Sequence, residues 1–454
     1  MADENMIHSG GMRPLNCDKN GNRMTQKRKL LIVCKNIPYP VYTGGDIRIF
    51  NLLKRISDVH EVSIICMSDI KLVQNAEKLR SFCKNIYIVP IVTDRRKIQK
   101  ITLFFRPKEW SRLWKRFHLL LRGVPFGNIV FYHSVFLDKL REILTKERYD
   151  LVQFEFIVTG QYLPFVSDLL KDSKTIMVQH GMIAEELNRM ADYAGGIEKI
   201  WHRIQAHLSM NYERKRLKQF DHVIAMSEVD RQKLINYGIN TEKITIIRSG
   251  VDVEEFRVSE IPRSDHRIVA LGTLKYLPNR EGLIWFLDNV FPLIKKKVKE
   301  CNLIVIGAED EGVIERYRER SVIFRGIVDK LETEMGKGMV FIAPIRIGTG
   351  TRLKIVTAMA FGMPVVSTAV ALEGIEAGEQ EGVIVADNEE DFGKAVVELL
   401  QSRERRYKLG ERARIFVERE YSWEAISADL CSLYDKLLPE GDRVEFPTQW
   451  NRRK

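Results

Sequence analysis

The sequence predicts an α/β protein made of two doubly wound, Rossmann-like domains that face each other across a cleft. Short apolar runs alternate with helical patterns in two series, one before and one after a polar stretch that contains Pro262. Such alternation is typical of parallel sheets that carry helices on both faces. In both series Gly-rich turns follow strands, and ligands of open α/β sheets bind at that end of the strands.

These patterns divide the 454 residues into two domains and several shorter segments. The polar stretch around Pro262 is the predicted linker, and an amphipathic helix closes the second series. We expect this helix to cross back to the N-terminal domain. The predicted parts are a disordered leader (1–28), an N-terminal domain (29–257), the linker (258–266), a C-terminal domain (267–420), the C-terminal helix (421–438) and a tail (439–454).

Composition excludes several classes of protein. The chain has no run of about 18 apolar residues, which a transmembrane helix requires, and its polar N-terminus lacks the apolar core of a secretory signal. The six cysteines are scattered without a C-x-x-C pair, which favours a reducing compartment and neither disulfides nor a zinc site. We therefore expect a cytoplasmic protein. The net charge of +11 indicates an anionic partner, which leaves nucleic acid, anionic lipid and nucleotide phosphates open.

The N-terminal series places two polar features at strand ends. Gly44 and Gly45 lead into a helix with Arg48 in its first turn, and these glycines allow a ligand to approach the backbone. A plain tight turn explains the same spacing equally well. His180 follows the strand at 175–179, at its carboxyl end. The predicted strands of this series are 29–35, 61–67, 86–91, 150–156, 175–179, 222–226 and 244–247, and a long helix is predicted at 196–220.

Residues 95–122 form a basic segment with an aromatic stripe. Glu109 is its only acidic residue. Its large apolar residues recur at helical spacing: Trp110, Leu113, Trp114, Phe117, Leu120 and Leu121. This pattern is typical of an amphipathic helix on an anionic membrane, although a helix packed on its own domain gives the same stripe. Aromatic and basic residues together can also bind single strands, but no nucleic-acid-binding motif accompanies them, so we expect no nucleic acid.

The second series centres on 340–368, VFIAPIRIGTGTRLKIVTAMAFGMPVVST. A buried strand, a Gly-rich turn (Gly348, Thr349, Gly350, Thr351), a helix that begins near Arg352 and a second strand follow one another. The turn and the helix N-terminus direct N–H groups at one spot, where Arg352 and Lys354 add positive charge, so a phosphate or diphosphate would fit. A tight connection with a solvated arginine remains the alternative. The spacing matches neither an ATP-binding P-loop nor G-x-G-x-x-G.

The other elements of this series fit the same pattern. Strands are predicted at 268–271, 303–306 and 322–324, with a turn at Gly272 and a helix at 280–297. No Asp-x-Asp pair, which holds a metal–diphosphate complex in one large class of sugar transferases, occurs in the chain. Charge on a leaving diphosphate would then be met by helix ends, arginine and lysine.

Taken together, these segments resemble the family-4 glycosyltransferases of the GT-B fold. The resemblance rests in the N-terminal half on IPYPVYTGGDIRIFNLL, VQHGMIAEE, FDHVIAMSEVDR and RSGVDVEEF. In the C-terminal half it rests on GTLKYLPNREGLIWF, IFRGIVDKL, the 344–368 segment and GEQEGVIVAD, so it covers nearly all of 29–438. The resemblance implies a retaining, metal-independent transferase that takes a sugar from a nucleotide diphosphate, with the acceptor on 29–257 and the nucleotide sugar on 267–420.

The resemblance also implies roles for single residues. His180 would lie by the donor sugar, or alternatively cap a strand end in a polar core, and with Arg352 and Lys354 it forms the expected catalytic set. Thr357 stands where many relatives carry a glutamate that binds ribose, as Thr349 does for the first glutamate of that pair. The implied substrate-binding residues are Gly44, Gly45 and Arg48 near the phosphates or the acceptor, Gly272 and Lys275 at the diphosphate, Gly326 to Val328 at the base, and Gly348, Thr349, Gly350, Thr351 and Thr357 at the phosphates and ribose.

Three functions are compatible with this sequence. The first is transfer of a sugar to a glycan or lipid-linked acceptor in cell-surface polysaccharide synthesis, with no cofactor besides the nucleotide-sugar substrate and with contact to the inner face of the membrane through 95–122. The second is a non-catalytic GT-B protein that binds a sugar nucleotide or supports a partner enzyme. The third is another GT-B enzyme, such as a nucleotide-sugar 2-epimerase, which would convert the donor without an acceptor.

Overall fold

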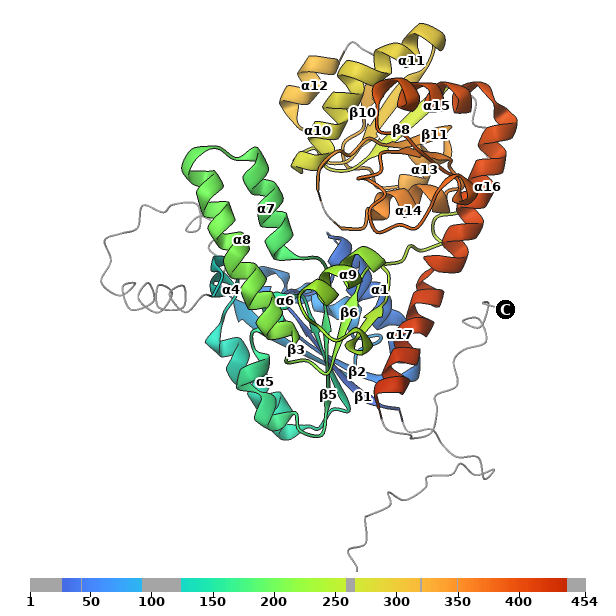
Figure 1. The fold of residues 1–454 in the computed structure, drawn as a ribbon. Helices are drawn as coiled ribbons and strands as arrows, with labels where there is room; N and C mark the ends of the chain where they lie inside the picture. The colour runs from blue at the N-terminus through green and yellow to red at the C-terminus, as the bar shows by residue number, and fades with distance from the viewer. Residues whose placement is uncertain are drawn as a thin grey trace, which may run out of the picture.

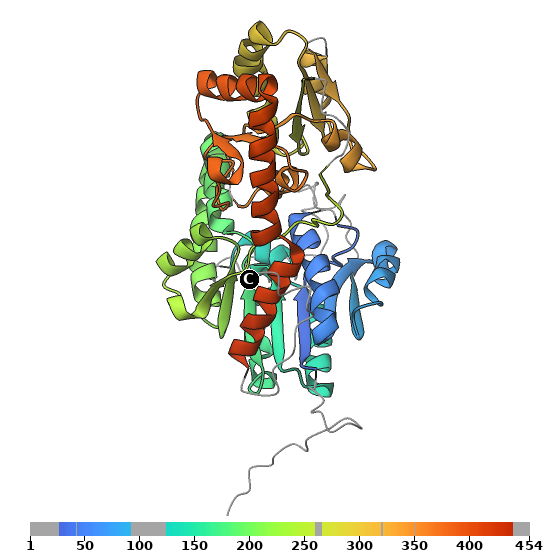
Figure 2. The ribbon, with the colours of Figure 1, turned by 90° about the vertical axis from the view of Figure 1, so that its right-hand side faces the viewer.

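The chain folds into two α/β domains stacked one above the other, with the C-terminal helix alongside the N-terminal domain (Figure 1, Figure 2). The computed structural model describes residues 27–41, 43–91, 124–258, 266–318, 321–348 and 350–438. The predicted fold class, two doubly wound parallel sheets, is confirmed. The amphipathic segment 95–122, the tail 439–454 and most of the leader and linker lie outside the described residues.

The N-terminal domain is built on a seven-stranded parallel sheet in the order β3-β2-β1-β4-β5-β6-β7. Its strands are β1 (Lys29–Cys34), β2 (Glu61–Asp69), β3 (Asn85–Ile91), β4 (Leu151–Glu155), β5 (Lys174–Val178), β6 (His222–Ala225) and β7 (Ile244–Ile246). Its α-helices are α1 (Gly44–Val59), α4 (Phe126–Val130), α5 (Ser134–Lys146), α6 (Ile157–Gly160), α7 (Ile183–Tyr193), α8 (Gly196–Leu217) and α9 (Glu228–Asn236).

The C-terminal domain repeats this design on a six-stranded parallel sheet in the order β10-β9-β8-β11-β12-β13. Its strands are β8 (Arg267–Leu271), β9 (Asn302–Ile306), β10 (Val322–Phe324), β11 (Val340–Ala343), β12 (Val365–Ser367) and β13 (Val383–Val385). Its helices are α10 (Leu277–Trp285), a π-helical turn (Phe286–Val290), α11 (Phe291–Lys297), α12 (Glu311–Tyr317), α13 (Leu331–Gly336), α14 (Leu353–Ala360), α15 (Glu389–Gln401) and α16 (Arg403–Glu420), and α17 (Trp423–Leu437) follows.

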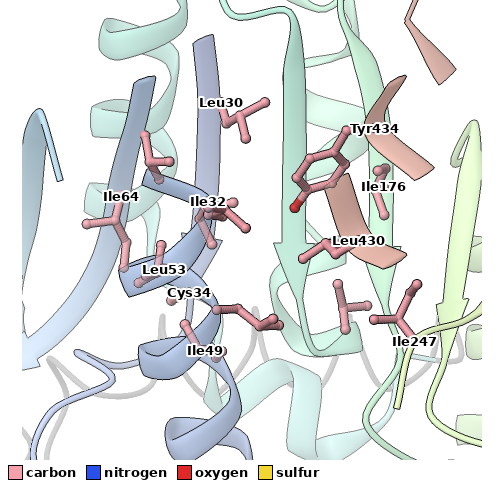
Figure 3. Close-up of a cluster of buried hydrophobic side chains, with 14 of the residues drawn as sticks. Leu30, Ile32, Cys34, Ile49, Leu53, Ile64, Ile176, Ile247, Leu430 and Tyr434 are labelled. Carbon is pink, nitrogen blue, oxygen red and sulfur yellow. The ribbon is translucent and has the colours of Figure 1, made fainter. Parts of the chain in front are cut away.

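Helix α17 belongs to the core of the N-terminal domain although it follows the C-terminal domain in the sequence. Leu430 and Tyr434 of α17 lie in the same buried cluster as Leu30 and Ile32 of β1 (Figure 3). Strand β1 can be this apolar because helices cover both faces of a parallel sheet. The helix thus returns across the domain boundary, as the sequence predicted.

One predicted helix is interrupted. The helical pattern at 280–297 forms α10, a π-helical turn and α11 in succession. Pro292 lies in the first turn of α11 and has no N–H to donate to the preceding turn, which accounts for the break in the regular α-helical ladder. Within the described ranges, no helix is both long and apolar enough to cross a membrane.

Two histidines of the N-terminal sheet region are buried in their neutral form. His60 is 2% exposed, and neither of its ring nitrogens has a hydrogen-bond partner among the described residues. His222 is 3% exposed, and its Nε2 lies 2.9 Å from Thr245 Oγ1. Burial lowers the pKa of each to about 4. Both histidines therefore favour the folded state only while they stay unprotonated.

This burial predicts a loss of stability in mild acid. The pKa values of the folded protein lie below the usual 6.5, so the stabilisation is complete above pH 6.5 and is lost as the pH falls toward 4. Each histidine should cost about 1.4 kcal/mol of unfolding free energy per pH unit in that window. Urea unfolding measures this effect at pH 7 and at pH 5.5. Between these two pH values, the unfolding free energy of His60→Leu should fall less than that of the wild type. Equal slopes would contradict the assignment of a buried neutral His60.

Candidate functional site

The Gly-rich turn before α14 is shaped by its glycines. Gly348 has φ 109° and Gly350 has φ 84°, a region that side chains disfavour. A Cβ atom on Gly348 would come within 3.1 Å of Arg352 Nη2 and 3.2 Å of Pro278. The turn therefore packs against Arg352, the N-cap residue of α14, and against Pro278 of α10. Thr349 lies outside the described residues.

Arg352 and Thr351 leave polar atoms unused at this turn. Arg352 is 9% exposed and donates from Nη1 to the carbonyl oxygen of Gly350. Among the described residues, its Nη2 and the hydroxyl of Thr351 are buried without a hydrogen-bond partner. Burial lowers the pKa of Arg352, and Glu373 acts in the opposite direction. Buried donors without a partner are costly, so an anionic ligand oxygen here would stabilise the site.

Lys354 extends the cationic site toward β8. Its Nζ donates to Asn279 Oδ1 at 2.6 Å, and Asn279 Nδ2 donates to the carbonyl oxygen of Thr273 at 2.9 Å. A side chain at Gly272, which has φ 145°, would displace this pair, because a Cβ atom would lie 2.6 Å from Asn279 Nδ2 and 3.0 Å from Lys354 Nζ. Burial, with Arg352 close by, lowers the pKa of Lys354 to about 7. A bound diphosphate would restore the full positive charge.

The ends of neighbouring strands meet beside this lysine. The backbone N–H of Gly307 donates to the carbonyl oxygen of Gly326 at 2.8 Å, and a Cβ atom on Gly307 would touch the backbone of Gly272. A small cavity below this edge is lined by Gly272, Asn279, Pro344 and Lys354 among others. Lys275 is exposed, and Val328 is half-buried against the core. Three of the predicted residues, Gly272, Gly326 and Lys354, are thus brought to one edge of the sheet.

The N-terminal domain contributes a histidine–glutamate pair. His180 follows β5, and its Nε2 lies 2.6 Å from Glu155 Oε2 at the end of β4. Phe156 stacks on the His180 ring with the centroids 3.9 Å apart and the planes 15° apart. Burial lowers the pKa of His180, although Glu155 acts to raise it. Glu155, Phe156 and Asn279 were not identified from the sequence.

The two Gly-rich turns come together across the domains. A Cβ atom on Gly45 would lie 2.4 Å from the Phe156 ring, and one on Gly44 would lie 3.5 Å from Leu353 Cδ1. The N-terminus of α1 therefore contacts the first residue of α14. His180, Phe156, α1 and α14 form one continuous path from the N-terminal to the C-terminal domain.

Arg48 does not lie where the sequence placed it. We expected this arginine in the cleft near phosphates or acceptor, but it is 1% exposed and donates to the carbonyl oxygen of Arg248. Its Nε and Nη2 have no partner among the described residues, and burial lowers its pKa to about 10. Helix α17 packs against α1, and Tyr434 of α17 and Glu155 of β4 lie near enough to Arg48 to act on its charge. Arg48 therefore supports the domain junction and is not available to a ligand in this structure.

Thr357 lies half-buried on α14, one turn before the helix ends. A hydroxyl at this position can make one hydrogen bond to a ligand, less strongly than a carboxylate. Within the part of the chain that the structure describes, no three His, Cys, Asp or Glu residues are grouped so that they could hold a metal ion.

Both halves of the chain match family models of sugar-transferring enzymes. Residues 42–255 match Glycosyltransferase Family 4, and residues 265–402 match Glycosyl transferases group 1. The chain is similar to an uncharacterized 44.6 kDa protein of the cps region of Klebsiella pneumoniae, with 22% identity over 88% of this chain and 98% of that protein. It is also 24% identical to a GDP-mannose-dependent alpha-(1-6)-phosphatidylinositol monomannoside mannosyltransferase of Mycobacterium tuberculosis, over 52% of this chain and 74% of the enzyme.

Solved structures share the fold. The crystal structure of HepE from Anabaena in complex with UDP and glucose superimposes with a TM-score of 0.61. The superposition covers 90% of this chain and all of HepE, at 13% sequence identity. This similarity extends over both domains.

The geometry predicts that Arg352 supplies most of the charge-assisted binding of a diphosphate. Arg352→Ala should weaken binding of UDP or GDP, whichever binds the wild type, by about 1.5–3 kcal/mol, the range for a hydrogen bond to a charged group. Isothermal titration calorimetry measures the difference. Arg346→Ala is the matched control, because Arg346 lies in the same turn but is 48% exposed and pairs with Glu281 at 3.5 Å. Unchanged affinity in Arg352→Ala would remove this residue from the site.

Proposed function

We propose that this chain, which belongs to the family 4, group 1 glycosyltransferases, transfers a sugar from a nucleotide-diphosphate sugar to a glycan or lipid-linked acceptor in polysaccharide biosynthesis. One observation carries the proposal: the cationic N-terminus of α14 meets the N-terminus of α1 through Leu353 and Gly44, directly beside His180 and its partner Phe156. A nucleotide diphosphate at α14 would thus direct its sugar toward the N-terminal domain.

The diphosphate would be bound by groups of the C-terminal domain. Arg352 Nη2, the hydroxyl of Thr351 and the free N–H groups of the first turn of α14 are its hydrogen-bond donors. Lys354, held by Asn279, adds a second cation. These groups meet the charge that develops on the leaving diphosphate, so we propose that transfer needs no metal ion.

The nucleoside would extend along the ends of the neighbouring strands. Gly326 to Val328 would present backbone groups and the 83% exposed side chain of Ile327 to the base. Thr357 would give the ribose one hydrogen bond in place of the carboxylate that many relatives carry there. Gly272, which lines the small cavity, and the exposed Lys275 would face the diphosphate.

The sugar would lie against His180, and the acceptor would enter from the N-terminal domain. Two relatives support this by their names: one is a capsular polysaccharide biosynthesis glycosyltransferase, and the other is a phosphatidylinositol monomannoside mannosyltransferase. We propose an acceptor of this class. We also propose that the anomeric configuration of the sugar is retained, as the family resemblance implies.

A transfer assay tests this proposal. UDP-glucose and GDP-mannose are first screened for a rise in melting temperature, since a ligand at a hundredfold excess over Kd stabilises by about 2.7 kcal/mol. With the stabilising donor, transfer to capsular or lipid-linked oligosaccharides is followed by proton NMR of the product. The product should keep the donor's anomeric configuration, and activity should survive excess EDTA. Inversion, or loss on chelation that manganese restores, would contradict the corresponding part of the proposal.

We further propose that the N-terminal domain contacts an anionic membrane. The amphipathic segment 95–122, on which the prediction from the sequence rests, lies outside the described residues. An apolar surface of the described residues lies near residue 124, where the described chain resumes. Exposed side chains recur at helical spacing on α8, namely Ile197 (86%), Ile200 (61%), Trp201 (43%) and Ile204 (50%). Phe126, at the start of α4, packs on Trp201 with the ring centroids 6.3 Å apart. Lys199 flanks this α8 stripe, as does Arg203, which pairs with Asp192 at 2.5 Å, so basic groups lie beside the apolar ones.

The α8 stripe predicts binding to liposomes. The chain should sediment with anionic and not with neutral vesicles, and salt should release it, because screening shortens the reach of its basic groups. Changing Ile197, Ile200 and Trp201 to Ser should abolish sedimentation without lowering the melting temperature, since these side chains are exposed. Tyr407→Ser with Ile415→Ser, on the exposed face of α16, is the matched control and should still bind. Full binding by the α8 triple variant would contradict the assignment of this surface.

A further inference from the structure

A buried chain of hydrogen bonds connects the C-terminal helix to His180. Tyr434 on α17 donates from its hydroxyl to Gln153 Oε1 at 2.7 Å, and Gln153 Nε2 donates to Glu155 Oε1 at 2.6 Å. The second oxygen of Glu155 lies 2.6 Å from His180 Nε2. Tyr434, Gln153 and Glu155 are at most 3% exposed. This series of hydrogen bonds therefore runs through the interior, from α17 across β4 to the histidine that follows β5.

The chemistry of these groups fixes the direction of every bond. The Gln153 amide must present its NH₂ to the carboxylate of Glu155, because the flipped amide would place two acceptors 2.6 Å apart. The carboxylate thus accepts on one oxygen from Gln153. On its other oxygen it accepts from His180, so Nε2 carries the hydrogen. In a neutral imidazole the remaining nitrogen, Nδ1, is then an acceptor.

The plane of the His180 ring is fixed by packing, just as its Nε2 is fixed by a hydrogen bond. Phe156 lies parallel to His180, and its own backbone has φ 68°, a conformation that a bulky residue rarely adopts. The Phe156 ring occupies the space that a side chain at position 45 would need, and Lys35 Nζ lies 4.1 Å from its centroid. Strain of this kind is retained where surrounding structure enforces it, often at functional sites. His180 is thereby held in one orientation, with 11% of its side chain exposed.

We propose that Glu155 is a positioning residue that holds His180 as the Nε2–H tautomer, so that Nδ1 accepts a hydrogen bond from a hydroxyl of the donor sugar. Gln153 and Tyr434 position Glu155 in turn. The inference rests on the proposed function, because it requires a sugar at His180. It also gives α17 a role beyond packing. This helix follows the C-terminal domain in the sequence, and through Tyr434 it helps to position His180 in the N-terminal domain.

The tautomer can be measured without any substrate. In the full chain labelled with ¹⁵N-histidine, the nitrogen–proton correlations of neutral His180 should show hydrogen on Nε2. Glu155→Gln should convert His180 to the Nδ1–H form or a mixture, because Gln153 and His180 face different oxygens of Glu155 and an amide would offer an oxygen to only one of them and an NH₂ group to the other. Thr245→Val is the matched control, because it removes the partner of another buried histidine, His222, outside this chain of bonds. It should leave the His180 signals unchanged.

Two further measurements distinguish a role of Glu155 in positioning His180 from a role in folding. Glu155→Gln should bind UDP or GDP like the wild type, since neither ligand carries the donor sugar that would lie against His180, while transfer falls by about tenfold to a hundredfold. Tyr434→Phe, which removes a single hydroxyl and serves if Glu155→Gln does not fold, should reduce transfer by about twofold to tenfold. Hydrogen on Nδ1 in the wild type, or an unchanged tautomer in both variants, would overturn the inference. Absence of binding by any nucleotide sugar would instead overturn the proposed function and leave the tautomer result standing.

Discussion

The site depends on two segments in which the chain passes from one domain to the other, because these segments fix the domains against each other. The first crossing follows β7, the second precedes α17, and the two pair with each other. The backbone N–H of Val251 donates to the carbonyl oxygen of Tyr421 at 2.8 Å, and Val251 forms a β-bridge with Ser422. Gly250 allows this approach, because a Cβ atom there would lie 2.7 Å from the Trp423 ring. Arg414 donates to the carbonyl oxygens of Val253 and Ala360 at 2.8 and 2.6 Å, and so ties the first crossing to the end of α14.

Each domain holds only half of the site, so this junction determines its geometry. Arg352 and Lys354 belong to one domain, and His180 belongs to the other. Across the cleft, Glu373 contacts Arg189 at 3.4 Å and Lys233 at 3.5 Å. Partly exposed pairs of this kind contribute about 0–1 kcal/mol each. The buried junction therefore sets the placement of the domains, and these ion pairs add little to it.

How far the sequence predicted the site depended on whether its residues are close in the chain. The strand–turn–helix at 340–361 can be predicted from the sequence directly, because Gly348, Gly350 and Arg352 are close together in the chain. Glu155 and His180 become partners only through the register of β4 with β5, which pairs Glu155 with Val178 and brings His180, two residues later, to the same face. Arg48 was misplaced for a related reason: a charge near the start of a helix is usually solvated, but here it is buried near Glu155 and Tyr434, which are distant in the sequence. No local pattern contains that tertiary contact.

If one ligand spans both domains, its diphosphate lies at α14 and its sugar lies at His180. Amide hydrogen exchange of the full chain can detect both contacts, with UDP or GDP in one sample and the matching nucleotide sugar in another. Either ligand should protect residues 350–355, and the nucleotide sugar alone should also protect residues 179–183. Protection confined to 350–355 with both ligands would contradict a sugar position at His180.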